Sequence, residues 1–151
     1  MQLYATLEVR YKNFITNIAK NEIVYALRDP KSGTYANCPS NEFQSDDGPA
    51  CEVVVFFSSQ TLAKACAKQE WAEYEICGFD LAEFLESWCA SISQNNAVLG
   101  IDFDANLYGF EADALELVLD VIEELKRQEK SIELQDFESL DELKEQVKSC
   151  F

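Results

Sequence analysis

The segment Glu52–Phe57, with the sequence EVVVFF, limits the possible folds of this chain more than any other feature. After Glu52 it presents apolar residues without interruption, so the segment predicts a strand that is buried on both faces of its sheet. The chain has 151 residues, of which 48% are hydrophobic, and this is enough apolar material for the core of one domain.

The remaining elements follow from periodicity and turn signals. Apolar positions at helical spacing predict a first amphipathic helix through Tyr11, Phe14, Ile15 and Ile18. Strands are expected over 22–29 and 97–103, with a hairpin return through 34–36 and a polar loop over 38–49. Further helices are expected over roughly 59–70, 81–92, from about 112 and from 140 to the chain end.

This order of elements predicts an α+β fold. Strands and helices interleave, but several strands read as hairpins, which favours a mostly antiparallel sheet of about four to six strands with helices packed on it. We expect residues 1–130 to form the α+β domain and residues 131–151 to form a C-terminal helical extension packed on the same domain.

Residues 69–125, which we call the base-free segment, contain no lysine, arginine or histidine but fourteen carboxylates. The whole chain carries a net charge of −16. Such a surface repels nucleic acid and anionic membranes and attracts basic proteins, so a basic protein partner is expected and neither nucleic acid nor a membrane is. The candidate partner-binding residues are the acids Glu73, Glu75, Glu83, Glu86, Asp113, Glu116, Asp120, Glu123 and Glu124.

The N-terminal sequence and the cysteines indicate the compartment. The first residues lack a basic stretch followed by an apolar one, so no signal peptide is expected and the cytoplasm is the expected location. The six cysteines are then expected to be reduced thiols, because a chain of this length can build a core without disulfides. We expect no cofactor.

Catalytic and metal-binding motifs are scarce. Histidine is absent, which excludes the Ser-His-Asp and Cys-His arrangements. Asp102, Asp104 and Asn106 alternate as the first ligands of a calcium loop do, but Leu107 stands where that loop needs glycine. These three residues are therefore only a weak metal candidate, and a hairpin turn is the simpler interpretation.

Spaced apolar and aromatic positions also suggest a family. The positions are Tyr11 and Phe14, Val24–Leu27, Val53–Phe56, Ala65 with Trp71 and Tyr74, Leu81–Leu85 with Trp88, and Val98–Asp102 with Gly109. Their order resembles the small bacterial proteins of domain of unknown function 2750, over roughly residues 9–125. The resemblance implies a bacterial cytoplasmic domain without an established activity, and it carries over no catalytic residue.

Two classes of function remain open. The first is a non-enzymatic acidic protein-binding domain, of which an immunity-type protein that neutralises a cationic toxin or nuclease is the specific form. The alternative is a housekeeping protein or an enzyme that uses carboxylates or a thiol. The sequence leaves monomer and homodimer open.

Overall fold

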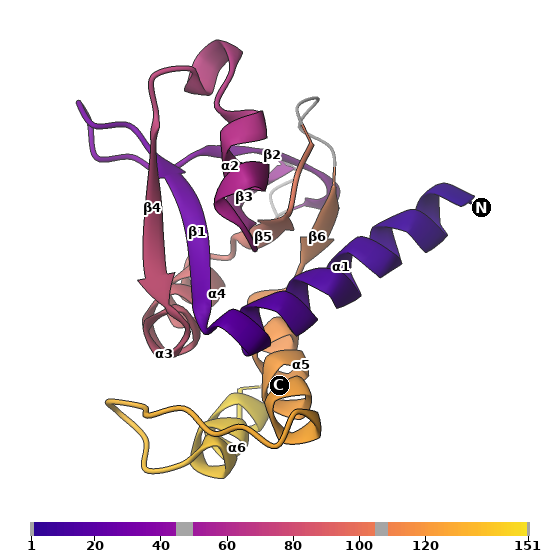
Figure 1. The fold of residues 1–151 in the computed structure, drawn as a ribbon, viewed down its shortest axis with the longest axis vertical. Helices are drawn as coiled ribbons and strands as arrows, with labels where there is room; N and C mark the ends of the chain where they lie inside the picture. Colours follow the sequence, from indigo (N-terminus) through magenta and orange to yellow (C-terminus); the bar gives the residue numbers. More distant parts are fainter. Residues whose placement is uncertain (1, 45–49, 105–108, 151) are drawn as a thin grey trace.

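The chain folds around a six-stranded mixed sheet in the order β4-β1-β3-β5-β6, with β2 also paired to β3 (Figure 1). This computed structural model describes residues 2–44, 50–104 and 109–150. The strands are β1 (Ile23–Arg28), β2 (Asn37–Gln44), β3 (Ala50–Phe57), β4 (Glu75–Asp80), β5 (Val98–Ile101) and β6 (Phe110–Ala112). The helices are α1 (Gln2–Asn21), α2 (Gln60–Cys66), α3 (Leu81–Glu83), α4 (Cys89–Gln94), α5 (Ala114–Arg127) and α6 (Leu140–Lys148). A 3₁₀ turn η1 (Gln69–Trp71) precedes β4, and a π-helical segment η2 (Phe84–Trp88) joins α3 to α4.

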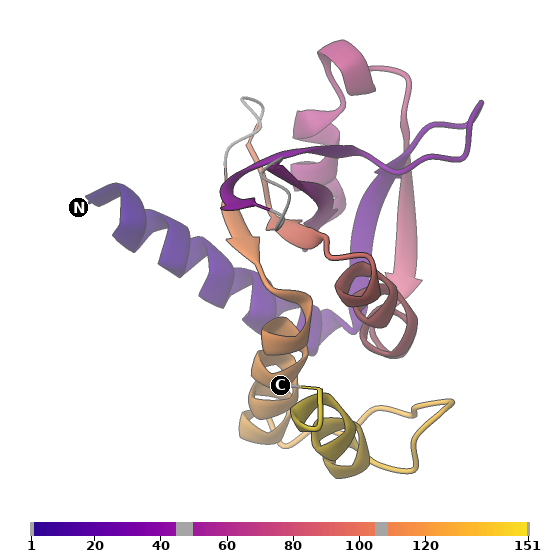
Figure 2. The same ribbon diagram turned by 180° about the vertical axis from the view of Figure 1, so that it is seen from behind.

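Strand β3 is buried on both faces, as its sequence predicts. Val55 and Phe57 pack with Ala63 of α2 and with Trp71 on one face of the sheet. Phe56 points to the opposite face, and all three strand residues are fully buried. Helix α2 therefore covers one face of β3 and lies behind the sheet in Figure 2, whereas η2, α4 and α5 pack in the core on the opposite face.

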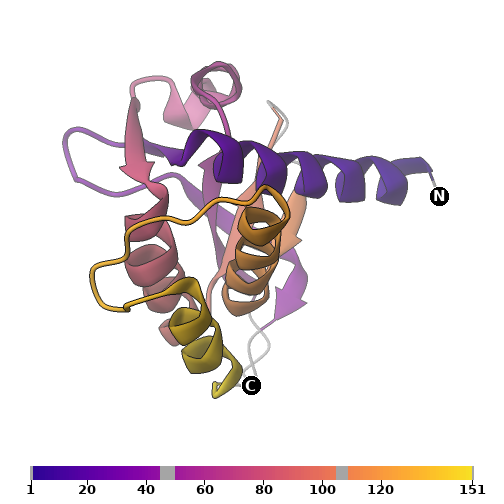
Figure 3. The ribbon, with the colours of Figure 1, turned by 60° about the horizontal axis from the view of Figure 1, so that its bottom comes forward.

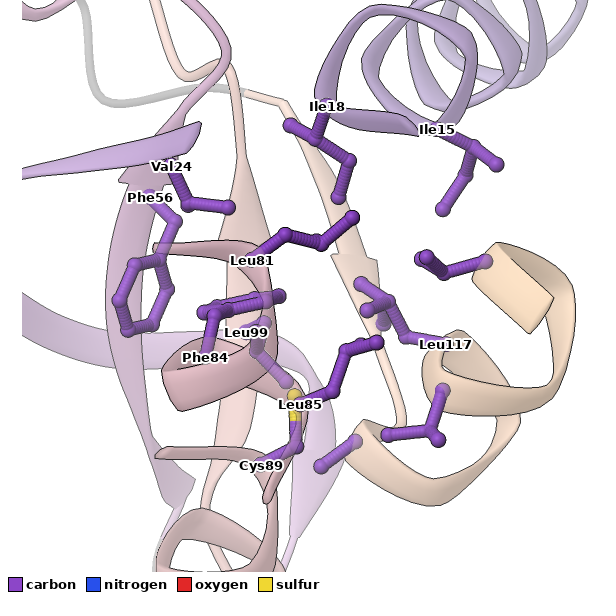
Figure 4. Close-up of a cluster of buried hydrophobic side chains, with 14 of the residues drawn as sticks. Ile15, Ile18, Val24, Phe56, Leu81, Phe84, Leu85, Cys89, Leu99 and Leu117 are labelled. Carbon is purple, nitrogen blue, oxygen red and sulfur yellow. The ribbon is translucent and has the colours of Figure 1, made fainter. Parts of the chain in front are cut away.

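The larger core lies under those other helices. Figure 4 shows Phe56 and Leu99 from the sheet facing Phe84 and Leu85, with Ile18 of α1 and Leu117 of α5 closing the space. The rings of Phe56 and Phe84 meet edge to face, with their centroids 5.0 Å apart. Burial of these large side chains is the main contribution to the stability of the fold.

Most strand pairs are antiparallel, which confirms the predicted fold class, but β3 and β5 run parallel. Val53 pairs with Val98 and Phe56 with Ile101. Because parallel strands end at the same edge of a sheet, the residues that follow them lie close together. Ser58 and Asp102 are those residues.

Two sequence-based expectations for the strands were wrong. Residues 38–49 were expected to be a loop, but β2 covers Asn37–Gln44. Pro39 is tolerated because β2 pairs only with β3, so one side of the strand needs no hydrogen bond. Strand β4 was not expected, because Gly78 weakens the short pattern of its sequence EICGFD.

Residues after α5 cross the molecule and return as α6, which lies beside α5 (Figure 3). Leu140, Leu143 and Val147 of α6 are buried in the larger core. Lys126 also donates a hydrogen bond to Asp141 at 2.5 Å. The domain boundary near residue 130 stays a prediction. Of the helices within the described ranges, none has the length and apolar character to span a membrane.

Candidate functional site

Helix α5 and its N-cap carry five of the nine acids predicted to bind a partner, and several of these five have internal roles. Asp113 is the N-cap of α5, and its carboxylate accepts a hydrogen bond from the Glu116 N–H at 3.0 Å. The Tyr11 hydroxyl donates to Asp120 at 2.5 Å. Burial, followed by that hydrogen bond to the carboxylate, raises the pKa of the Tyr11 hydroxyl. These contacts hold α1 against α5.

The C-terminal half of α5 is paired with bases. Lys144 of α6 lies 3.4 Å from the Glu123 carboxylate, and Nε of Arg127 donates to Glu124 at 2.9 Å. The hydrogen bond from Arg127 lowers the pKa of the Glu124 carboxyl. The acids of this half are therefore partly neutralised by the bases that follow the base-free segment.

Glu86 anchors the C-terminal extension. One carboxylate oxygen accepts from the Gln135 N–H at 3.0 Å, and the other accepts from the Asp136 N–H at 2.8 Å. Both donors belong to a segment without regular secondary structure. The sequence marked Glu86 as a partner-binding acid, but its contacts are those of a structural residue.

The three other predicted acids are separated. Glu75 begins β4. Glu73 lies 3.9 Å from Lys31, and the side chains of Glu73 and Lys31 are both largely exposed. Glu83 lies at the opposite end of β4, in α3 (Figure 1). The nine acids thus lie at both ends of the edge strand and along α5 and do not form one continuous cluster.

A groove gathers a different set of acids. Its volume is about 470 Å³, and the carboxylates that line it are those of Glu22, Asp80, Glu83 and Glu133. Apolar residues, among them Leu81 and Leu134, also line it. Lys130 reaches the groove edge and pairs with Glu22 at 2.9 Å. Sequence reasoning missed three of the four acids, because they come from elements far apart in the chain.

A second site forms where the parallel strands β3 and β5 end. Asp102 accepts two hydrogen bonds from Ser58, one from the backbone N–H and one from the hydroxyl, each 2.8 Å long. Asp102 has a φ of +46°, a left-handed conformation that aspartate tolerates better than most residues. Ser58 is only 4% exposed, so the pair is largely shielded from water.

Burial changes the acidity of Asp102. Desolvation raises the pKa of its carboxyl above the ordinary value, and it outweighs the Ser58 hydrogen bonds and the charge of Arg10, which lower it. Beside it, the Arg10 guanidinium lies 4.0 Å from the Asp104 carboxylate. Two carboxylates and one guanidinium therefore share this edge of the sheet.

These groups line a cavity of about 390 Å³. The lining residues are Arg10, Asn13 and Asn17 of α1, Leu62 and Ala65 of α2, and Ser58, Asp102, Phe103 and Asp104 at the strand ends. The Cys66 thiol donates to the carbonyls of Phe103 and Asp104 at 2.9 and 3.1 Å, which fixes the chain after β5.

The weak metal candidate is not assembled by the described residues. Asn106 lies outside them, both oxygens of Asp102 accept from Ser58, and Asp104 faces Arg10. Within the described ranges, no group of three or more histidine, cysteine, aspartate or glutamate side chains is placed to hold a metal ion.

The buried thiols are not activated for nucleophilic chemistry. Burial, followed by the charges of Asp104 and Asp102, raises the pKa of Cys66 to about 11. Burial also raises the pKa of Cys89, which lies in the larger core. A thiol nucleophile needs a lowered pKa, so neither of these residues has the environment of a catalytic cysteine.

The comparison with protein families agrees with the sequence-based resemblance. A family model described as "Protein of unknown function (DUF2750)" matches residues 11–121. The chain belongs to this family. The resemblance predicted over roughly residues 9–125 is thereby confirmed. No curated protein and no solved structure matches the chain.

The residues matched by the DUF2750 model include almost all of the cavity lining but only part of the groove lining. Of the cavity's lining residues, only Arg10 lies outside residues 11–121. The acidic groove, in contrast, includes Ile132, Glu133, Leu134 and Gln135, which follow the match. The cavity is therefore built almost entirely by the family domain, whereas the groove needs the C-terminal extension.

Proposed function

We propose that this protein is a non-enzymatic acidic binding domain of the bacterial cytoplasm that binds a basic protein. In its specific form it is an immunity-type protein, which occupies the cationic cleft of a toxin or nuclease. The observation that carries the proposal is the acidic groove, which four carboxylates and several apolar residues line together.

The groove has the composition of a protein-binding site. Interfaces commonly combine apolar and polar groups, and the groove is lined by both, with Leu81 and Leu134 beside its four carboxylates. Among the residues that the structure describes, one base, Lys130, forms an ion pair with a carboxylate of the groove, and the chain as a whole carries a net charge of −16. A basic segment with apolar residues would therefore be attracted from a distance and held by contact.

The surroundings of the thiols support this proposal over a thiol enzyme. Cys66 and Cys89 have raised pKa values, so they stay protonated near neutral pH. Binding by charge complementarity needs no thiol with a lowered pKa.

Charge-reversal pairs test the proposal. The full chain would be cross-linked through its carboxylates to the basic proteins of the bacterium that produces it, and the modified residues would be mapped by mass spectrometry. We expect cross-links to one basic protein, concentrated at Glu83 and Glu133. The double variant Glu83→Lys, Glu133→Lys should weaken binding of that protein by about a hundredfold, since each charge pair contributes on the order of 1–2 kcal/mol.

The matched control is the double variant Glu138→Lys, Glu145→Lys, which changes the net charge equally at exposed positions outside the groove. It should reduce affinity only modestly. Equal losses in the two double variants would contradict a specific site and indicate a generally acidic surface. Binding that does not weaken with added salt would also contradict the proposal.

A further inference from the structure

Strand β4 lies at the margin of the sheet and pairs only with β1 among the described strands (Figure 1). The Leu81 N–H donates to the Glu22 carbonyl at 3.0 Å, in register with the β1–β4 ladder. Because hydrogen-bonded pairs alternate along an antiparallel ladder, every second residue back from Leu81 bonds to β1. The backbone N–H and C=O groups of Ile76 and Gly78 therefore point away from β1, and within the described ranges no strand pairs with that side of β4.

The other strands with an unpaired side carry features that hinder further strand pairing. Strand β6 has only three residues, and β2 contains Pro39 and a register shift before Gln44. In β4, all six residues pair with β1 without a shift, and none of them is proline. Acidic residues at its two ends, Glu75 and Asp80, repel acidic strands and attract basic ones. Strand β4 is therefore the most regular place for another strand to pair with this sheet.

An apolar surface reaches the free side of β4. Ile76 is 37% exposed, and it is one of only three large apolar side chains in the described ranges that are exposed to this degree. A Cβ atom at Gly78 would lie 3.1 Å from Cδ1 of Ile23 and 3.3 Å from Cε1 of Tyr25, so both of these side chains lie over Gly78. Ile76 and Gly78 are two residues apart and share one face of the sheet. That face offers hydrocarbon contact to a side chain of an added strand.

Charge is distributed unevenly along β4. At the start of the strand, Arg28 stands opposite Glu75, and Lys31 lies 3.9 Å from Glu73. At its end, β4 runs into the acidic groove, whose lining residues include four carboxylates and no lysine or arginine. Lys130 pairs with one of these carboxylates, and the other three form no ion pair with the residues that the structure describes. Attraction of a basic segment is therefore strongest at the groove end of β4.

A basic extended segment matches the backbone groups, the apolar surface and the charges together. Strand addition supplies main-chain hydrogen bonds, and alternate side chains of the added strand provide specificity. A second copy of this chain would bring another net charge of −16 to the groove, which opposes pairing. We propose that β4 accepts an extended segment of a basic partner as an additional strand, with apolar side chains against Ile76 and Gly78 and lysines or arginines over the groove. The basic character of the segment rests on the function proposed above.

The test titrates the full-length protein with a short blocked peptide, in which valine and threonine alternate between lysines at both ends, and follows the amide NMR signals. We expect saturable shifts centred on β4 and the groove, with a dissociation constant of about 0.1–1 mM for so short a strand. The matched peptide carries N-methyl groups on two adjacent central residues, which removes a donor from each edge of the peptide and leaves its charge unchanged. It should bind at least about tenfold more weakly.

Variants of β4 locate the contact. Gly78→Pro removes an outward N–H that the ladder to β1 does not use, so the fold should persist while peptide binding weakens about fivefold or more. Ile76→Lys should weaken binding about tenfold, because a repelling charge replaces an apolar contact, and this variant serves if Gly78→Pro does not fold. The matched control is Leu62→Lys, which makes the same change on α2 at a residue that is 39% exposed, and it should leave the affinity within about twofold.

Four outcomes would overturn strand addition. The first three are no saturable binding of the peptide up to about 5 mM, equal binding of the N-methylated peptide, and equal losses in Ile76→Lys and Leu62→Lys. The fourth is a shift of the β4 signals when the protein alone is diluted, because a second copy would then occupy the edge. The function proposed above is judged separately, by the cross-links of the full chain to a basic protein at the groove, so a basic partner held without strand addition would leave that function standing.

Discussion

Asp102 and Glu123 both belong to the base-free segment, yet the structure gives them opposite surroundings. The Asp102 carboxylate is half-buried and receives two hydrogen bonds from Ser58. The Glu123 side chain is 69% exposed, and its carboxylate lies 3.4 Å from Lys144. The first carboxylate is fixed and costly to ionise, while the second is solvated and screened by salt.

This difference shows that the number of acids determines the electrostatic field of a protein but does not locate its binding sites. A solvated acid contributes to the long-range attraction of a basic partner and little to stability. A half-buried acid has a fixed orientation and a changed pKa, which are the properties of a binding group. Glu86 stands between the two, because it lies near the surface and yet holds two backbone N–H groups.

The largest expected difference is between Asp102→Ala and Glu123→Ala. Asp102→Ala leaves the N–H and hydroxyl of buried Ser58 without their acceptor, which should cost about 1–3 kcal/mol of unfolding free energy. Glu123→Ala should change it by no more than about 0.5 kcal/mol. Urea denaturation of both variants measures the difference. Equal effects would mean that Asp102 is as solvated as Glu123.

Glu86→Ala tests the intermediate case. Loss of the acceptor for the Gln135 and Asp136 N–H groups should cost about 1 kcal/mol and loosen the extension. Hydrogen exchange should quicken across residues 131–139, while β3 stays protected. Glu83→Ala, three residues away and without these bonds, is the control. An unchanged exchange rate across residues 131–139 would mean that Glu86 does not hold the extension in place.

Titration with acid should separate the two kinds of carboxylate by the sign of their effect. The pKa of Asp102 lies above its ordinary value, so the folded state favours the protonated carboxyl. Ionisation of Asp102 therefore lowers the stability of the fold as the pH rises through that pKa. The Lys126 hydrogen bond lowers the pKa of Asp141, so that pair stabilises the fold at neutral pH and is lost as pH falls through the lowered value.

Carboxyl-carbon NMR can measure both pKa values in one sample. Ser58→Ala should raise the pKa of Asp102 further, because the hydroxyl hydrogen bond favours the charged form. The pKa of Asp141 should stay where it is in that variant. If Asp102 titrated below Asp141, the contrast between the two environments would be refuted.

Salt should have the smallest effect. Screening of the net charge of −16 should raise the melting temperature by about 2–4 °C between low and moderate ionic strength, which corresponds to roughly 1 kcal/mol. The destabilisation caused by Asp102→Ala should be the same at both ionic strengths, since its lost hydrogen bonds are shielded. A melting temperature that is flat or falls with salt would contradict the repulsion.

Much of the fold could be predicted because local patterns report burial directly. The uninterrupted apolar run Val53–Phe57 predicted a strand covered on both faces, and β3 is buried on both. Strand β2 could not be predicted in the same way. Its sequence NCPSNEFQ is polar and contains proline, and only the free edge of β3 makes it a strand.

The same distinction between local patterns and spatial neighbours applies to the candidate sites. The sequence by itself determined the family, the α+β class and the sign of the field, because these depend on composition and on periodicities within single elements. Only the tertiary structure decided which acids act together. In the folded chain, Glu86 and Asp120 accept hydrogen bonds from distant parts of the sequence. Ser58 donates to Asp102, which lies forty-four positions further along the chain. The physical reason is that desolvation and hydrogen bonding depend on neighbours in space, which no single element of the sequence contains.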